Sequence, residues 1–263
     1  MILVKTTLGS LATLVRGQGD RTLVLWPSVF TDHHIFERLA DGLEDRYRII
    51  LIDGPGHGQS GGPEASFSMA QCATAMLEVM DYHGVEVASV GGVSWGGMVS
   101  AHVAVMAPER VERLLLINTP MFLGDSEPAL AARLIALGAR WMPGSTLFRK
   151  GVAGSFFSDK ALAANPSYAK AFNAMLKRAK PRALGAAIRS VMLESEPVAP
   201  LLPQIAAPTL VIAGENDAMY PIADLRKVSE RLPKGRFETV LGKHISPIEA
   251  PDDVERLVHE FLQ

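Results

Sequence analysis

The chain has few of the features that link a protein to a disulfide scaffold, a membrane or a nucleic acid. Its single cysteine, Cys72, cannot form an internal disulfide, which is typical of a reducing compartment and leads us to expect a cytoplasmic protein. No apolar run approaches the roughly 18 residues of a membrane span, so we expect none. The formal net charge is −2, and this total makes no electrostatic case for nucleic acid or for an anionic membrane.

Signals for metals and cofactors are equally scarce. No group of Cys, His, Asp and Glu has the spacing of a metal site. The stretch DGPGHGQS (53–60) lacks the Gly-Lys-Ser/Thr ending of a phosphate-binding loop. We interpret it as a Gly-Pro turn in which Asp53 and His57 are structural. We therefore expect no metal and no cofactor.

What the chain does have is a regular alternation of apolar runs and helical patterns. Apolar residues recur at helical spacing between Ser66 and His83, for example, and Gly84 stands at the end of that pattern. Strands this apolar, alternating with helices, predict a mostly parallel sheet with helices on both faces. We place its eight strands as a pair within 1–15 and then at 22–26, 46–53, 85–92, 110–118, 208–214 and 235–241.

The alternation stops between Pro120 and Pro203. This stretch contains several helical patterns separated by Pro and Gly, and we find no convincing strand in it. The sequence therefore predicts a core domain built from residues 1–119 and 204–263, interrupted by an all-helical segment at 120–203.

Four glycines surround one serine in GGVSWGGM (91–98), between a predicted strand and a predicted helix. Gly92 to Gly96 fits G-x-S-x-G, the pattern of a sharp strand-to-helix turn that lifts a nucleophilic Ser94 above a sheet. Glycines permit the close backbone approach that such a turn needs. The simpler alternative is a glycine-rich turn in which Ser94 only caps the helix.

A serine hydroxyl needs an oriented base to become a nucleophile at neutral pH. Asp217 follows the strand at 208–214, and His244 follows the strand at 235–241. The order Ser94, Asp217, His244 is the one expected for this kind of sheet. Because parallel strands deliver their C-terminal loops to one edge, we expect the three side chains to converge.

With these residues in view, the chain resembles the α/β-hydrolase superfamily over essentially its whole length. The resemblance rests on GGVSWGGM, IDGPGHGQS (52–60), GENDAMYP (214–221) and GKHISPIEAP (242–251). It implies that the helical insertion after the sixth strand is a cap, or lid, and that Ser94 is the nucleophile, His244 the general base and acid, and Asp217 the orienting carboxylate. Within the superfamily the chain is most similar to small capped esterases, enol-lactonases and cofactor-free perhydrolases.

One departure concerns the oxyanion hole. Members of the superfamily commonly carry His-Gly after the third strand, where this chain reads LWPSVFTDHHIF (25–36). Pro27 and Ser28 take that place, so we expect the N–H groups of Val29 and Trp95 to hold the oxyanion; an offset of one residue would make the first donor Ser28. His33 and His34 either touch substrate or lie at a helix start. We expect the substrate pocket to be lined by Trp95, Phe30, His34, Met121, Phe122 and Trp141.

These residues predict a serine hydrolase acting on a small, largely apolar carboxylic ester or lactone. Asp125 is a rival to Asp217 as the acid, because some members of the superfamily carry the acid in that region. Two other functions are compatible with the same residues. One is hydrolysis of a C–C bond in a diketone, and the other is a small-molecule receptor built on a hydrolase scaffold, in which the triad is slow or vestigial.

Overall fold

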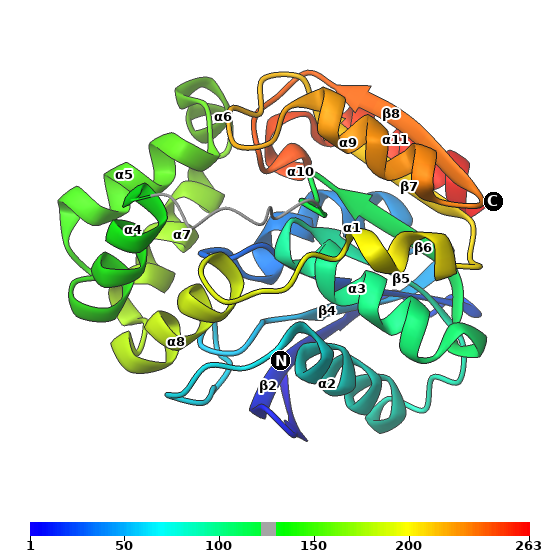
Figure 1. Ribbon diagram of the computed structural model, residues 1–263, viewed down its shortest axis with the longest axis horizontal. Helices are drawn as coiled ribbons and strands as arrows, with labels where there is room; N and C mark the ends of the chain where they lie inside the picture. Colours follow the sequence, from blue (N-terminus) through cyan, green and yellow to red (C-terminus); the bar gives the residue numbers. More distant parts are fainter. Residues whose placement is uncertain (122–129) are drawn as a thin grey trace.

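An eight-stranded sheet forms the centre of the computed structural model, which describes residues 1–121 and 130–263 (Figure 1). Its strand order is β1-β2-β4-β3-β5-β6-β7-β8. β1 and β2 pair antiparallel, as do β2 and β4, and every other neighbouring pair is parallel. The strands are β1 (Ile2–Thr6), β2 (Gly9–Arg16), β3 (Arg21–Trp26), β4 (Tyr47–Ile52), β5 (Ala88–Val93), β6 (Val111–Ile117), β7 (Thr209–Gly214) and β8 (Gly235–Val240). The predicted mostly parallel sheet is confirmed.

Helices cover both faces of this sheet. On one face α2 packs against α3, and η3 contacts both α3 and α9. On the other face α1 packs against α11. The helices of this layered part are α1 (Glu37–Leu43), α2 (Met69–Tyr82), α3 (Trp95–Met106), α9 (Ile222–Arg231), α10 (Ser246–Glu249) and α11 (Pro251–Leu262), with short 3-10 turns η1 (His33–Phe36), η2 (Pro108–Arg110) and η3 (Ala199–Gln204).

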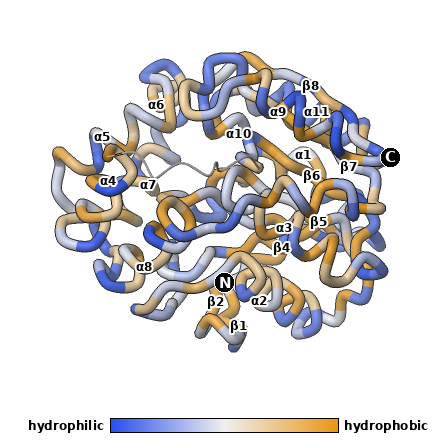
Figure 2. Tube along the Cα trace, in the orientation of Figure 1, coloured by the Kyte–Doolittle hydropathy of each residue, from blue (hydrophilic) through white to orange (hydrophobic). Residues whose placement is uncertain are grey.

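The strands differ in burial according to their place in the sheet. Every residue of β5 and β7 is buried, as a strand covered by helices on both faces requires. The edge strands β1 and β8 leave most of their residues exposed or half-buried. Figure 2 shows the same contrast, with apolar residues concentrated along the central strands. Cys72 is buried in α2 within this core.

Between β6 and β7 the described chain is helical, with no strand in the part of 120–203 that the structure covers. The helices are α4 (Leu130–Trp141), α5 (Thr146–Phe156), α6 (Asp159–Ala164), α7 (Pro166–Arg178) and α8 (Pro181–Met192), and they gather at one end of the molecule (Figure 1). We call them the helical segment. Within the ranges that the structure describes, no helix is both long and apolar enough to cross a membrane.

The helical segment is tied to the loop that follows β8. The backbone N–H and hydroxyl of Ser158 donate to the Glu249 carboxylate over 2.6 and 2.9 Å. The Lys243 ammonium donates to the carbonyl oxygens of Gly154 and Phe157 over 3.1 and 3.2 Å. These contacts hold α5 and α6 against the part of the chain that contains His244.

Candidate active site

Ser94 occupies the turn between β5 and α3 in a strained backbone conformation. Its φ of 53° and ψ of −111° lie in a region that non-glycine residues rarely adopt. The turn is held by a 2.8 Å hydrogen bond from the Ser94 N–H to the carbonyl of Ile117, at the end of β6.

The flanking glycines make this turn possible. A Cβ at Gly92 or Gly96 would lie 2.1 or 1.8 Å from the Trp26 carbonyl oxygen, closer than atoms can approach. The glycines in the motif therefore let the Ser94 turn pack directly on the end of β3, which leads into the predicted oxyanion loop.

Asp217 and His244 form a buried, hydrogen-bonded pair. His244 Nδ1 lies 2.8 Å from Asp217 Oδ2, and both side chains are almost fully buried. Asp217 Oδ1 also accepts a 2.9 Å hydrogen bond from the Met219 N–H. Burial by itself would raise the pKa of the Asp217 carboxyl, but the hydrogen bond and charge of His244 and the backbone donor outweigh it and lower that pKa. An ionised Asp217 selects the tautomer of His244 that has its proton on Nδ1.

This tautomer leaves His244 Nε2 as a hydrogen-bond acceptor. Nε2 is buried and has no hydrogen-bond partner among the described residues. The rings of Phe156 and Tyr220 lie 5.2 and 5.4 Å from the His244 ring, centre to centre. Leaving a buried acceptor without a partner costs free energy, and a role in a reaction is one reason for such an atom to be kept.

Asn118 connects the Ser94 turn to the Asp217–His244 pair. It follows Ile117, whose carbonyl holds Ser94, and has a positive φ of 46°. Its Nδ2 donates to Asp217 Oδ2 over 3.1 Å, and its Oδ1 accepts a hydrogen bond from the Ser246 hydroxyl, two residues after His244. Sequence reasoning missed this residue; the available signal was its position as the polar residue that ends a buried strand.

His57 fixes the loop that follows β3. Its Nδ1 donates to the Pro55 carbonyl over 3.0 Å, and its Nε2 accepts a 2.9 Å hydrogen bond from the Phe30 N–H. Phe30 has a positive φ of 59°. Burial lowers the pKa of His57, which keeps the accepting nitrogen unprotonated. The Thr31 N–H and hydroxyl both donate to the Ser28 carbonyl. Val29 lies between these anchored residues; its role as an oxyanion donor, or that of Ser28, stays a prediction.

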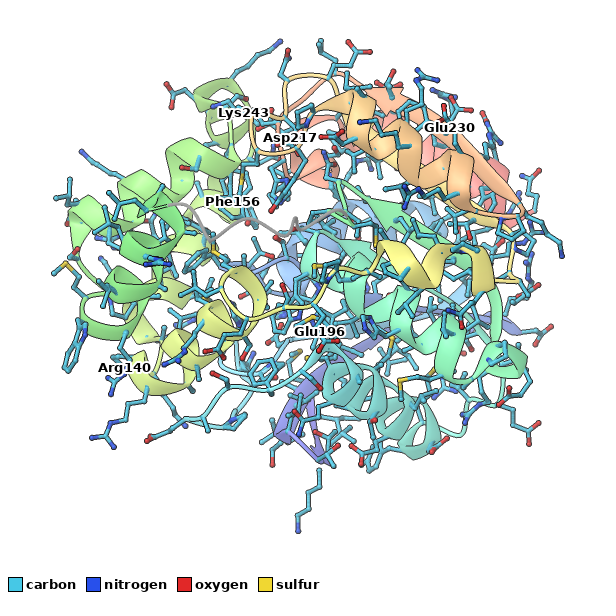
Figure 3. All side chains as sticks on the ribbon, in the orientation of Figure 1. Arg140, Phe156, Glu196, Asp217, Glu230 and Lys243 are labelled. Atoms are coloured by element: carbon cyan, nitrogen blue, oxygen red, sulfur yellow. The ribbon has the colours of Figure 1, made fainter. Side chains whose placement is uncertain are left out.

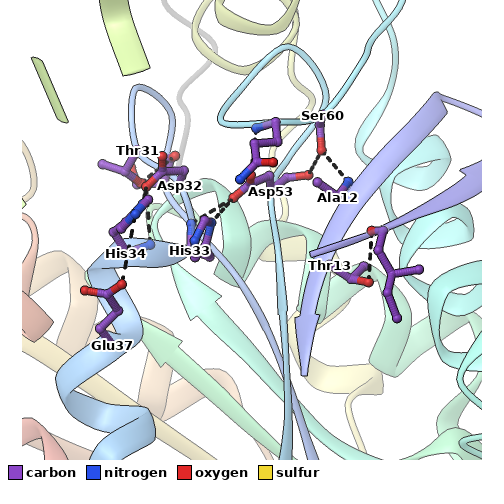
Figure 4. A network of polar contacts seen from close by, with 12 residues as sticks. Ala12, Thr13, Thr31, Asp32, His33, His34, Glu37, Asp53 and Ser60 are labelled. Carbon is purple, nitrogen blue, oxygen red and sulfur yellow. Dashed lines mark hydrogen bonds and ion pairs between the residues drawn. The ribbon is translucent and has the colours of Figure 1, made fainter. Parts of the chain in front are cut away.

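A second set of polar contacts holds η1 beneath this loop (Figure 4). Asp53 Oδ1 accepts from the backbone N–H of His33 over 2.9 Å and lies 2.7 Å from His33 Nδ1. Asp32 caps η1 and lies 2.7 Å from His34 Nδ1. Asp32, His33 and His34 are the group in the described chain whose ligand atoms lie within 4.8 Å of one another. The Nδ1 atoms of both histidines are used in these contacts, which tie Asp53 and the two histidines to the loop.

The predicted substrate residues fall in different places. Phe30 and Met121 are buried, and His34 is half-buried beside Asp32. The ring of Trp95 is fully buried against Trp26, His57 and Phe67, so its side chain belongs to the core and only its backbone N–H remains a candidate for the site.

The structure does not bring Trp141 to an enclosed site. Trp141 is 70% exposed, and its ring packs under the guanidinium of Arg140 at 4.7 Å. Arg140 lies at the outer edge of the helical segment, well away from Asp217 and Phe156 (Figure 3). The apolar character of Trp141 led us to expect it in the substrate pocket, but helix α4 turns this side chain to solvent. Phe122 and Asp125 lie outside the described residues.

An apolar cavity of about 260 Å³ opens between the helical segment and Phe30. The Phe30 ring meets the Phe156 ring at 6.1 Å, and Phe156 in turn contacts His244. The cavity therefore begins one aromatic ring away from the candidate base. It is lined by Phe30, Leu134, Ile135, Phe148, Gly151, Val152, Ser155 and Phe156.

Comparison with known proteins identifies the family and agrees with the fold. A family model described as alpha/beta hydrolase fold matches residues 21–251. The chain is 27% identical over 248 residues to 3-oxoadipate enol-lactonase 2 of Acinetobacter baylyi, which covers 94% of this chain and 91% of that protein. It is 29% identical over 241 residues to a pimeloyl-[acyl-carrier protein] methyl ester esterase of Chromobacterium violaceum, covering 87% and 89% of the two chains. A solved hydrolase of Pseudomonas aeruginosa superimposes with a TM-score of 0.89 at 29% identity, covering 99% of this chain and 97% of that one.

The titration of His57 should make the stability of the protein depend on pH. Because burial lowers its pKa, the folded state holds this proton less tightly than the unfolded state. The stabilisation that depends on neutral His57 is complete above the unfolded value of about 6.5 and is lost as the pH falls through the folded value. In urea unfolding, the wild type should therefore lose stability relative to His57→Gln between about pH 8 and about pH 5.

His34 provides a matched control with the opposite sign. The hydrogen bond with Asp32 raises the pKa of His34 more than partial burial lowers it. Its stabilisation is complete below about pH 6.5 and is lost as the pH rises through the folded value. The advantage of the wild type over His34→Gln should thus shrink between about pH 5 and about pH 8. If both variants showed the same trend, the assigned hydrogen-bond roles would be wrong.

Proposed function

Because the chain belongs to the alpha/beta hydrolase family, we propose that it is a serine hydrolase that cleaves a small, largely apolar carboxylic ester or lactone. Ser94 is the nucleophile, His244 the general base and acid, and Asp217 the carboxylate that orients His244. No cofactor takes part in the reaction.

One observation carries this proposal: a buried Asp217–His244 pair leaves Nε2 without a partner, and Asn118 ties that pair to the end of β6, which holds the strained Ser94 turn. Asn118 links both halves of this arrangement through its contacts with Asp217 and its position after Ile117. A strained serine, a base and an orienting acid are the three parts that nucleophilic acyl transfer requires. Asp217, with its lowered pKa, also stabilises the imidazolium that forms during the reaction.

The reaction proceeds through an acyl-enzyme. The Ser94 hydroxyl attacks the ester carbonyl carbon while His244 Nε2 accepts the hydroxyl proton. The N–H groups of Trp95 and Val29 hold the oxyanion, and each such donor contributes on the order of 3 kcal/mol to the transition state. Collapse of the tetrahedral intermediate breaks the C–O bond, and His244 gives its proton to the departing alkoxide. Water, deprotonated by His244, then attacks the acyl group and releases the acid.

The surroundings of His244 favour an apolar substrate. The cavity of about 260 Å³ is lined by phenylalanines, aliphatic residues and one serine, as expected for an apolar acyl or alcohol group. The names of two relatives support the ester or lactone bond, since one is an enol-lactonase and the other a methyl ester esterase. In this proposal residues 120–203 form a cap over the core domain of 1–119 and 204–263, and α4 and α5 shape the specificity pocket.

Ser94 should be the covalent nucleophile. Ser94→Ala should lower turnover of a short-chain aryl ester on the order of 10⁶-fold, because removing a triad nucleophile leaves only the oxyanion hole and binding. A fluorophosphonate should label the wild type once, on the peptide that contains Ser94. Ser100→Ala, in the same helix, is the matched control and should keep both properties. Full turnover by Ser94→Ala, or labelling of another residue, would show that the chain uses different chemistry.

Phe156 should determine which chain lengths are accepted. Phe156→Ala enlarges the apolar cavity next to His244, so kcat/KM should shift toward longer acyl or alcohol chains by roughly tenfold for one or two methylenes. Trp141→Ala changes an equally large residue of the helical segment that faces solvent, and its chain-length profile should match the wild type. The measurement is kcat/KM over a series of aryl esters. An unchanged profile for Phe156→Ala would remove this cavity from the binding site.

A further inference from the structure

The charge of the chain is distributed very unevenly. The helical segment, Leu130–Met192, contains eleven lysines and arginines and one acidic residue, Asp159. It therefore carries a formal charge of +10 and the rest of the chain −12, which together give the −2 of the whole. The small net charge conceals a strongly basic end of the molecule. Charge asymmetry of this kind is typical of proteins that meet an anionic surface.

The same end exposes an apolar stripe. Along α4 the side chains of Leu130, Leu134, Leu137 and Trp141 are spaced three or four residues apart and are between 55% and 72% exposed. The buried residues of this helix, Ala136 and Ala139, lie on the opposite side. The residue that follows the helix, Met142, is also exposed, as is Leu147 at the start of α5, at 83%. A helix that is apolar on both sides is normally covered on both sides.

Arginines border this stripe. The two polar residues of α4 are both arginines, Arg133 and Arg140. They face Arg182 and Arg189 of α8 across a groove of about 900 Å³, to which Leu137 also contributes. Arg182 pairs with Glu64 and Arg189 with Glu194, so the groove combines four guanidinium groups with two carboxylates.

We propose that α4 and the bordering arginines dock the protein onto an anionic lipid surface. Helices with exposed Leu and Trp on one face and cationic residues beside them lie in the lipid–water interface, with the apolar face among the acyl chains. The arginines meet anionic headgroups. The same face of a second copy fits this surface less well, because two surfaces of this charge repel each other.

Docking in this way would place the apolar cavity against the lipid. Leu134 belongs to the exposed stripe and also lines the cavity that begins beside Phe30 and Phe156. An apolar substrate could then pass from the lipid phase toward His244 without crossing water. This consequence rests on the proposed function, whereas docking itself involves no residue of the Ser94, Asp217 and His244 set.

Vesicle flotation tests the proposal with the full-length wild type. The protein should float with vesicles of phosphatidylcholine and phosphatidylglycerol in equal parts, and much less with phosphatidylcholine alone. High salt should weaken this binding. Leu130→Ser combined with Trp141→Ser, and separately Arg133→Gln combined with Arg140→Gln, should each reduce binding by roughly tenfold or more. Val87→Ser and Lys5→Gln, which change an exposed apolar residue and an exposed lysine elsewhere, should float like the wild type.

The controls separate this proposal from its alternatives. Ser94→Ala should float like the wild type, because docking does not depend on the proposed chemistry. Normal turnover of a soluble ester by the Leu130→Ser/Trp141→Ser variant would show that this variant is folded. Absence of flotation, or equal flotation with neutral and charged vesicles, would overturn the proposal. A dimer in solution that the stripe substitutions dissociate would also overturn it and would assign the face to a second copy. Tight binding to polyglutamate without vesicle binding would overturn it as well and would assign the face to an acidic protein.

Discussion

The hydrogen bond between Asp217 and His244 is the contact on which the rest of the site depends. It is made between two loops that follow neighbouring parallel strands, β7 and β8, and it is buried. In that setting an ionised carboxylate orients the imidazole and leaves Nε2 as an acceptor. The neighbouring features serve this contact: Asn118 and the Met219 N–H hold the carboxylate, and Lys243 and Glu249 fasten the surrounding loop to the helical segment.

The second constraint is the backbone around Ser94. Gly92 and Gly96 let the serine turn approach the end of β3 closely enough for the loop from Pro27 to Thr31 to lie beside it. His57 then fixes that loop through the Phe30 N–H. The structure therefore separates two tasks: buried hydrogen bonds position the proposed reacting groups, while the helical segment provides an apolar cavity and a large exposed surface.

Much of this could be predicted from the sequence, for reasons that are local. Apolar runs at strand length, the glycine-flanked Ser94 and the positions of Asp217 and His244 after strands are all visible within a few residues. The roles of Asn118 and His57 could not be predicted in this way, because their partners, Asp217 and Phe30, lie 99 and 27 residues away in the chain. The orientation of α4 was also out of reach: two arginines are its polar residues, and they do not show which apolar side meets solvent, so Trp141 was expected in the pocket. The division of charge between the two parts of the molecule is contained in the sequence, but the total of −2 conceals it.

The rate at which a fluorophosphonate acylates Ser94, measured alongside ester turnover in Asp217→Asn and Asp125→Asn, tests the central claim most directly. If Asp217 orients His244, Asp217→Asn should stay folded and lower kcat on the order of 10⁴-fold, with a comparable loss in acylation, because the imidazole loses its correct tautomer. Asp125→Asn should behave like the wild type. A large loss in Asp125→Asn with little change in Asp217→Asn would contradict the account and move the acid to another part of the chain.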